Sequence, residues 1–287
     1  MGIRFAICNE LFEGWPLKRV LAYCAGVGYD GVELAPFTLA TDVREFPRGR
    51  ARELRRAADG AGISIIGLHW LLASPPGLSI NGPDPAAREN TRDFMFALIR
   101  LCRELGGQVL VFGSPKQRSV GQDDTYDAAW GRAVEMLRIC GEEAERRGAV
   151  IALEPLTTRE TNFLTTAKEA VRLIDEVDCP AVRLHLDVKA MVGQERKSPE
   201  WVIMEHKDYL AHFHANDANL RGPGFGETDF APIAKALHEI GYDGYVSVEV
   251  FDFSPDPETI ATQSLAYLRK VFAKRSEASD PSSSAEA

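Results

Sequence analysis

The feature that most limits the fold of this chain is a pattern that occurs eight times: a short apolar run rich in β-formers, a loop, an amphipathic helix and a glycine turn. The expected helices cover approximately residues 16–28, 48–61, 85–105, 125–147, 167–177, 199–206, 231–240 and 257–273. The expected strands cover residues 3–8, 31–34, 63–69, 109–112, 150–154, 182–187, 210–214 and 245–250. Eight strand–helix pairs are what a closed α/β barrel, the (β/α)8 or TIM barrel, requires.

A single barrel domain is predicted over residues 1–275. Residues 276–287 contain only Ser, Ala, Glu, Asp and Pro, a composition that predicts a disordered tail. An open doubly wound sheet is the competing architecture. It is disfavoured because no Gly-x-Gly-x-x-Gly follows the first strand, as a dinucleotide site would require.

The formal charge of -9 argues against a nucleic-acid partner, since phosphate binding needs clustered Lys and Arg. We find neither a signal peptide nor an apolar run long enough to span a membrane. The five cysteines are scattered and mostly lie in apolar patterns. This usage is typical of a reducing compartment, so we expect a cytoplasmic protein without disulfides.

Four predicted strands in the second half of the chain end on a residue that binds metals well. These residues are Glu154, Asp187, His214 and Glu249, spaced 27 to 35 residues apart. The residue before each is large and apolar, which suits the layer facing the helices, so all four should point into the barrel. Adjacent strands lie about 4.8 Å apart, and four inward groups at one level can therefore converge on a single ion.

Three carboxylates grouped without a cation would repel one another and take up protons. A divalent metal resolves this repulsion, and the set of carboxylates and one imidazole suits Mn, Mg, Co or Zn, of which we favour Mn. Taken singly, each acidic residue has a plainer interpretation as a helix cap or surface charge. His185, His212 and Asn216 are interpreted as groups that support the ligands or simply pack in the core.

Several motifs resemble those of the xylose isomerase-like barrels, in particular the keto-sugar epimerases such as D-tagatose 3-epimerase. They are Leu153-Glu154-Pro155, the strand ending at Asp187, His212-Phe213-His214, Pro223-Gly224-Phe225-Gly226 and Ser247-Val248-Glu249. The resemblance implies that Glu154, Asp187, His214 and Glu249 hold the metal and that Glu154 and Glu249 also carry protons. It further implies that Glu160 holds the substrate and that the protein is a dimer or tetramer.

Two positions depart from the pattern of those epimerases. Ala190 stands where they carry a histidine, with Lys189 before it, and Leu220 stands where they carry an arginine, with Arg221 after it. We expect Lys189 and Arg221 to contact the substrate instead. His69 and Trp70, with Glu10 and Glu33, end the first three strands and are further candidates for outer contacts. Ser114, Lys116 and Arg118 follow the fourth strand and suit either an anion site or, as we favour, a solvated loop.

These residues predict a metal-dependent isomerase or epimerase that acts on a keto-sugar or sugar phosphate through an enediolate, with two glutamates as acid and base. A lyase or dehydratase that uses Lys189 or His69 as an acid is the alternative. An endonuclease of the same superfamily would need further His and Asp ligands and a basic groove. A metal-binding barrel without catalysis, acting as a partner subunit, is the remaining alternative.

Overall fold

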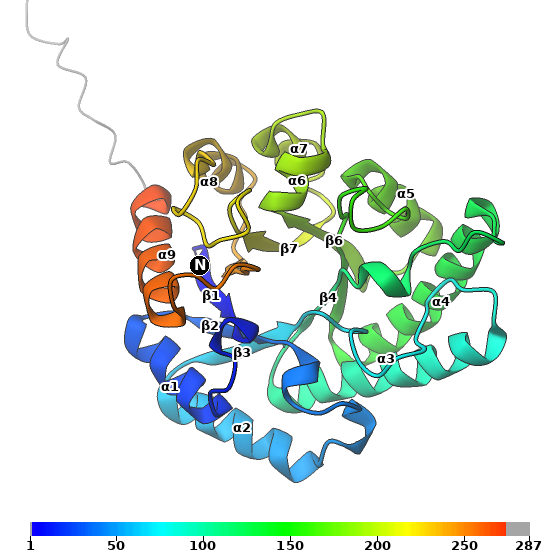
Figure 1. Cartoon of the computed structure of the whole chain (residues 1–287), viewed down its shortest axis with the longest axis horizontal. Coiled ribbons are helices and arrows are strands. Elements are labelled where there is room, and N and C mark those ends of the chain that lie inside the picture. The colour runs from blue at the N-terminus through cyan, green and yellow to red at the C-terminus, as the bar shows by residue number, and fades with distance from the viewer. Residues whose placement is uncertain (1, 274–287) are drawn as a thin grey trace, which may run out of the picture.

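Eight parallel strands form one closed barrel in the computed structural model, which describes residues 2–273. The predicted tail at 276–287 lies outside the described residues. The strands are β1 (Arg4–Cys8), β2 (Gly31–Leu34), β3 (Ser64–Leu68), β4 (Val109–Phe112), β5 (Val150–Leu153), β6 (Val182–Asp187), β7 (Leu210–Ala215) and β8 (Tyr245–Val248). The ring closes where β1 pairs with β8, with Ala6 opposite Ser247. The predicted barrel is therefore confirmed (Figure 1).

The helices pack around the outside of the barrel (Figure 1). They are α1 (Leu17–Val27), α2 (Arg48–Ala61), α3 (Pro85–Leu105), α4 (Tyr126–Arg147), α5 (Ala167–Val177), α6 (Val188–Gln194), α7 (Pro199–Glu205), α8 (Phe230–Glu239) and α9 (Pro257–Phe272). All eight predicted helices match within one residue at each end, with 199–206 corresponding to α7. The short helix α6, which comes before α7, was not predicted from the sequence.

Local sequence explains where several helices begin and end. Asp84 accepts a hydrogen bond from the backbone N–H of Ala86 (2.9 Å) at the start of α3, and Pro85 occupies the first position of that helix. Gly106 ends α3 with a φ of 98°, a left-handed conformation that glycine adopts without steric cost. The chain thereby turns directly into β4.

The hydrophobic core lies between the strands and the helices. Leu153, Leu186, Phe213 and Val248, the residues that precede the four candidate ligands, are all buried in it. Because side chains alternate along a strand, the following residue of each strand faces the barrel interior. Each candidate ligand is thus directed to the carboxyl end of the barrel, the end at which TIM-barrel enzymes place their active sites.

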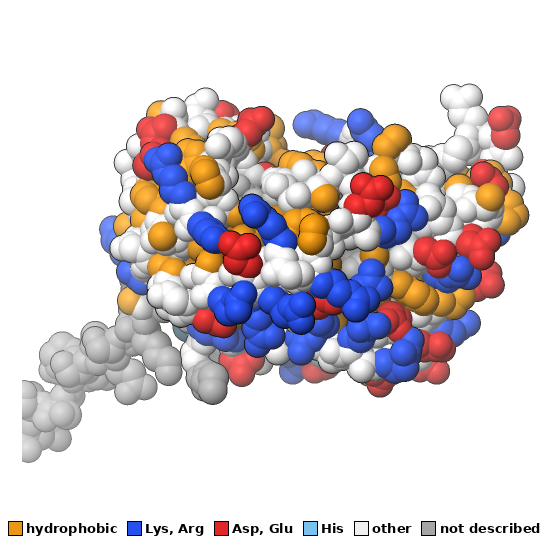
Figure 2. Space-filling view, turned by 90° about the horizontal axis from the view of Figure 1, so that it is seen from below, with side chains coloured by type: hydrophobic (Ala, Val, Ile, Leu, Met, Phe, Trp, Pro, Cys, Tyr) orange, Lys and Arg blue, Asp and Glu red, His pale blue; other side chains and the backbone are white. Residues whose placement is uncertain are grey.

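The outer face over α1 to α3 carries a mixture of charges (Figure 2). Arginines are frequent on α2, but Lys18 pairs with Glu53 and Arg48 with Glu104 across neighbouring helices. No helix within residues 2–273 has the length and apolar character needed to cross a membrane.

Candidate active site

Glu154, Asp187, His214 and Glu249 converge at the carboxyl end of the barrel. Each offers one ligand atom, and these atoms all lie within 4.8 Å of one another. The strand register produces this arrangement, since Asp187 lies directly opposite His214 and His214 opposite Ser247. All four side chains are buried. The structure therefore brings together the four residues that the sequence singled out.

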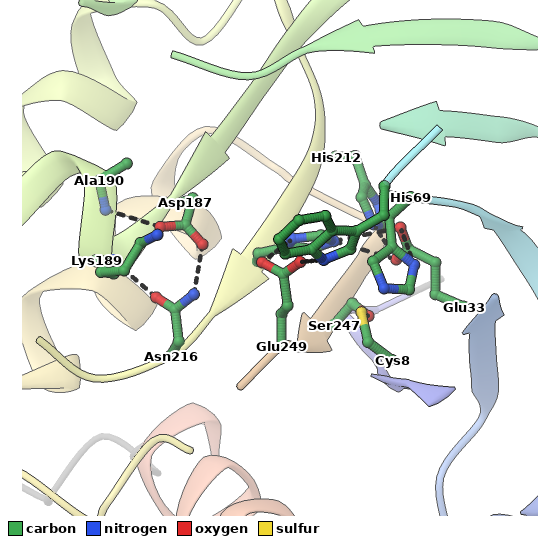
Figure 3. A network of polar contacts seen from close by, with 12 residues as sticks. Cys8, Glu33, His69, Asp187, Lys189, Ala190, His212, Asn216, Ser247 and Glu249 are labelled. Carbon is green, nitrogen blue, oxygen red and sulfur yellow. Dashed lines mark hydrogen bonds and ion pairs between the residues drawn. The ribbon is translucent and has the colours of Figure 1, made fainter. Parts of the chain in front are cut away.

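Asp187 is held in place from two sides (Figure 3). One carboxylate oxygen accepts a hydrogen bond from the backbone N–H of Ala190 (2.7 Å) in the first turn of α6. The other accepts one from the side-chain amide of Asn216, whose own oxygen accepts from the backbone N–H of Lys189 (2.7 Å). Asn216 thus orients a candidate ligand rather than acting as one.

Glu33 contacts the ring nitrogen of His214 that faces away from Glu249. The Nδ1 of His214 lies 3.1 Å from Glu249, on the side of the cluster, whereas its Nε2 faces both oxygens of Glu33 at 3.3 Å. Glu33 also contacts Nε2 of His212 at 2.8 Å. This arrangement leaves Nδ1 as the nitrogen directed at a ligand position, with the imidazole oriented by a buried carboxylate.

The prediction that Glu33 makes an outer contact was wrong. Its side chain is fully buried. Burial alone would raise its pKa, but His212 and His214 outweigh burial and hold that pKa below its usual value. The strand that carries Glu33 is 179 residues from His212 in the chain, so only closure of the barrel brings the two together.

Glu249 makes a second contact across the mouth of the barrel. Its Oε1 accepts a hydrogen bond from the indole Nε1–H of Trp70 (3.1 Å). Trp70 has a φ of 53°, in the left-handed region that a bulky residue seldom occupies. The backbone at the end of β3 is therefore strained in the conformation that places this indole against the carboxylate.

The carboxylate of Glu154 occupies space that a side chain at position 113 would fill. A Cβ added at Gly113 would collide with Oε2 of Glu154. Behind it, the guanidinium of Arg118 donates to the backbone carbonyl of Glu154 (2.6 Å) and to that of Leu164 (3.3 Å). Arg118 is entirely buried, so neither a solvated loop nor an anion site describes it.

Electrostatics distinguish the two glutamates. Burial, together with the carboxylates of Glu249 and Asp187, raises the pKa of Glu154 to about 8. Burial also raises the pKa of Asp187. Burial acts in the same direction on Glu249, but the adjacent His214 outweighs it and the pKa of Glu249 lies below its usual value.

This set of side chains fits a divalent cation. Three buried carboxylates meet one imidazole, and the raised pKa values of Glu154 and Asp187 indicate too little positive charge nearby. A bound ion would supply that charge. The cluster has the donor types that Mn, Mg, Co and Zn accept.

Comparison with known proteins agrees with the fold. The family model described as "Xylose isomerase-like TIM barrel" matches residues 21–271. The chain belongs to the xylose isomerase-like TIM barrel family. A D-psicose 3-epimerase of Enterocloster bolteae is 32% identical over 253 residues, which cover 87% of this chain and 81% of the relative.

Two further relatives broaden the comparison. The 3-dehydro-D-guloside 4-epimerase of Escherichia coli is 32% identical over 135 residues, covering 47% of this chain and 51% of the relative. A D-psicose 3-epimerase crystallised with D-tagatose, from Clostridium cellulolyticum H10, superimposes with a TM-score of 0.82 at 25% identity, over 94% of this chain and 99% of that one. The relatives support a sugar isomerase or epimerase.

In this xylose isomerase-like barrel, an inner cavity of about 40 Å³ lies beside the cluster. Its lining includes Glu154, Glu249, Glu160, Lys189, His69 and Trp70. The Lys189 ammonium pairs with Glu160 (2.9 Å) and lies 4.1 Å from the centre of the Phe251 ring. Although burial would lower the pKa of Lys189, Asp187 and Glu160 outweigh it and raise that pKa.

His69 also lines the inner cavity. Its Nε2 lies 2.7 Å from a carboxylate oxygen of Glu10, and its Nδ1 has no hydrogen-bond partner among residues 2–273. The structure thus places His69, Trp70, Lys189 and Glu160 around one cavity. That these four residues contact the substrate stays a prediction.

Arg221 is not brought to the inner cavity. Its guanidinium pairs with Asp252 (2.9 Å), and its side chain is 39% exposed. Arg221 follows Leu220, which has a φ of 72°, and it is not among the residues that line the inner cavity. The prediction that Arg221 contacts the substrate is not supported by this placement.

Proposed function

We propose that this chain is a divalent-metal-dependent keto-sugar epimerase that uses Glu154 and Glu249 as acid and base. The observation that carries the proposal is the convergence of four ligand atoms within 4.8 Å in a barrel whose curated relatives are sugar epimerases. Glu154, Asp187, His214 and Glu249 would hold the ion, and we favour Mn²⁺. When bound, the ion would polarise the substrate carbonyl and stabilise negative charge on its oxygen.

The two glutamates approach the inner cavity from strands β5 and β8, which are separated in the ring by β6 and β7. A substrate carbon between them would lose its proton to one carboxylate, and the planar enediolate that results would receive a proton from the other carboxylate. Addition to the opposite face inverts the carbon centre, which is the outcome of epimerisation. The indole N–H of Trp70 donates a hydrogen bond to Glu249 and would orient that carboxylate for this transfer.

Lys189 and Glu160 would hold the sugar oxygens beside the reacting carbon. Both oxygens of Glu160 are fixed, one by Lys189 and the other by the hydroxyl of Thr157 (2.8 Å). Within residues 2–273, Lys189 is the one Lys or Arg that lines the inner cavity, beside Glu154, Glu160 and Glu249. With a divalent ion bound, the carboxylates of these glutamates and of Asp187 still outnumber the positive charges of the ion and Lys189. The surroundings therefore favour an uncharged keto-sugar over a phosphate.

The test is exchange of a carbon-bound proton in deuterated water. The Mn²⁺-loaded protein should exchange a proton of D-psicose or D-fructose and interconvert the two. Glu154→Gln and Glu249→Gln should each lower the exchange rate at least about a hundredfold, since acid–base groups contribute on that scale. Both should retain the melting temperature within a few degrees.

Glu89→Gln serves as the matched control, because Glu89 lies exposed on α3. Exchange at the normal rate in both cluster variants would contradict the proposed roles. Exchange accompanied by loss of water or of an aglycone would instead identify a lyase.

A further inference from the structure

Two cavities adjoin at the carboxyl end of the barrel and share two walls. The inner cavity has a volume of about 40 Å³, whereas its neighbour has about 990 Å³. Trp70 and Phe251 line both. Sites for small molecules usually measure about 300–1,000 Å³, so the inner cavity can hold only the reacting part of a sugar. The remainder of the substrate must extend past Trp70 and Phe251.

The larger space, here called the aromatic cavity, is lined by six aromatic rings. They are Phe12, Trp15, Phe37, Trp70, Phe251 and Phe253. No Lys or Arg within residues 2–273 is part of this lining, which includes the carboxylates of Glu10 and Glu13. An anionic group would therefore be repelled there, and an uncharged apolar group would be favoured.

Polar partners in the aromatic cavity are largely engaged already. The side chain of Asn9 donates to the hydroxyl of Thr38 (2.9 Å) and accepts from the backbone N–H of Ala35 (2.7 Å). One oxygen of Glu10 is held by His69, whereas the other has no hydrogen-bond partner among residues 2–273. The hydroxyl groups of a bare sugar would exchange water for few new hydrogen bonds, which costs free energy.

The walls are preformed. The ring of Trp15 packs against Phe12 and Tyr23, each with a centroid distance of 5.4 Å, and the guanidinium of Arg19 lies 3.5 Å from its centre. Phe37 stands at the rim with 43% of its surface exposed. A rigid aromatic wall with an exposed ring at its edge binds an apolar ring without paying much ordering entropy.

We infer that the aromatic cavity binds an aromatic group joined to the keto-sugar by a glycosidic bond. The sugar would occupy the inner cavity beside the cluster, and its aglycone would lie between Trp15 and Phe37. This inference rests on the proposed function for the sugar half, and on the shared walls of the two cavities for the aglycone half.

The test compares two probes that differ only in the aglycone: methyl and phenyl 3-dehydro-β-D-glucopyranoside. Isothermal titration calorimetry on the full Mn²⁺-loaded chain should give a dissociation constant for the phenyl probe that is lower by about tenfold or more, because one buried ring contributes on that scale. Phe37→Ala, at the exposed rim, and Trp15→Ala should each reduce this preference to below about threefold.

Trp201→Ala is the matched control, because Trp201 is an equally exposed ring (42%) on α7 and is not part of the cavity lining. It should retain the full preference. Equal affinities for the two probes, or a preference that survives both Phe37→Ala and Trp15→Ala, would overturn the inference. Binding does not require turnover: if no sugar exchanges its proton yet the phenyl preference persists, the proposed function fails and the aromatic cavity stands.

Discussion

Glu154 has the least compensated carboxylate of the cluster. It is buried beside two other carboxylates, and its pKa of about 8 means that the metal-free protein holds a proton there at neutral pH. A bound cation would displace this proton. Metal affinity should consequently increase as pH rises toward 8.

The same shift predicts how the metal-free protein responds to pH. In the unfolded chain Glu154 ionises near 4.5, and in the folded chain near 8, so the folded state binds the extra proton between these values. The free energy of unfolding should therefore fall as pH rises from about 4.5 to 8. Urea unfolding of chelator-treated protein at several pH values measures this slope.

Glu154→Gln isolates the contribution of this carboxyl, because the amide does not titrate. The variant should lose less stability than the wild type over the same interval. If both proteins show the same slope, Glu154 is not the group responsible.

A further prediction at the residue scale concerns the hydrogen bond from Trp70 to Glu249. Trp70→Phe keeps an apolar ring but removes the indole N–H that donates a hydrogen bond to Glu249 (3.1 Å). The loss of one hydrogen bond to a charged group should lower kcat by roughly tenfold or more, with little change in melting temperature. Trp201→Phe, on the exposed face of α7, is the control. An unchanged kcat in Trp70→Phe would contradict an orienting role for the indole.

At the scale of elements, the segment after β4 differs most from its sequence interpretation. Three polar residues, Ser114, Lys116 and Arg118, suggest a solvated loop, but only Lys116 is exposed. Arg118 turns inward and binds the end of β5 and the loop before α5 through two carbonyls. Composition alone does not reveal this, because its partners are backbone groups 36 and 46 residues away.

Arg118→Met should therefore destabilise the fold. The change removes the guanidinium donor from the carbonyl of Glu154 and one of two donors from the carbonyl of Leu164, which also accepts from the backbone N–H of Leu156 (3.1 Å). Losing the buried donor of the Glu154 carbonyl predicts a loss of about 2 kcal/mol or more in the free energy of unfolding. It should also weaken metal binding, since Glu154 loses its support. Lys116→Met, two residues away on the surface, should change neither property. Equal stability of the two variants in urea unfolding would disprove this role for Arg118.

The short helix α6 shows a second limit of sequence interpretation. Asp187 ends β6 and also accepts from Ala190 to begin the helix, so no loop separates the two elements. A strand followed at once by seven helical residues offers too short a periodic pattern to recognise. The same junction places Lys189 in the inner cavity, which is why the departure from the epimerase pattern has a structural consequence.

At the scale of the whole molecule, the barrel and its cluster were predictable because both depend on repetition. Eight alternating segments define the ring, and alternation along each strand defines which residues face inward. Contacts across the ring were not predictable. Glu33 meets His212, and Trp70 meets Glu249, only because β1 closes on β8. The dimer or tetramer expected from the resemblance stays a prediction.

The central claim is that Glu154, Asp187, His214 and Glu249 share one divalent cation. Anomalous diffraction from crystals grown with Mn²⁺ tests it most directly. The account predicts a single strong peak about 2.0–2.4 Å from one atom of each of the four side chains. The absence of a peak there, or a peak held by other residues, would contradict it.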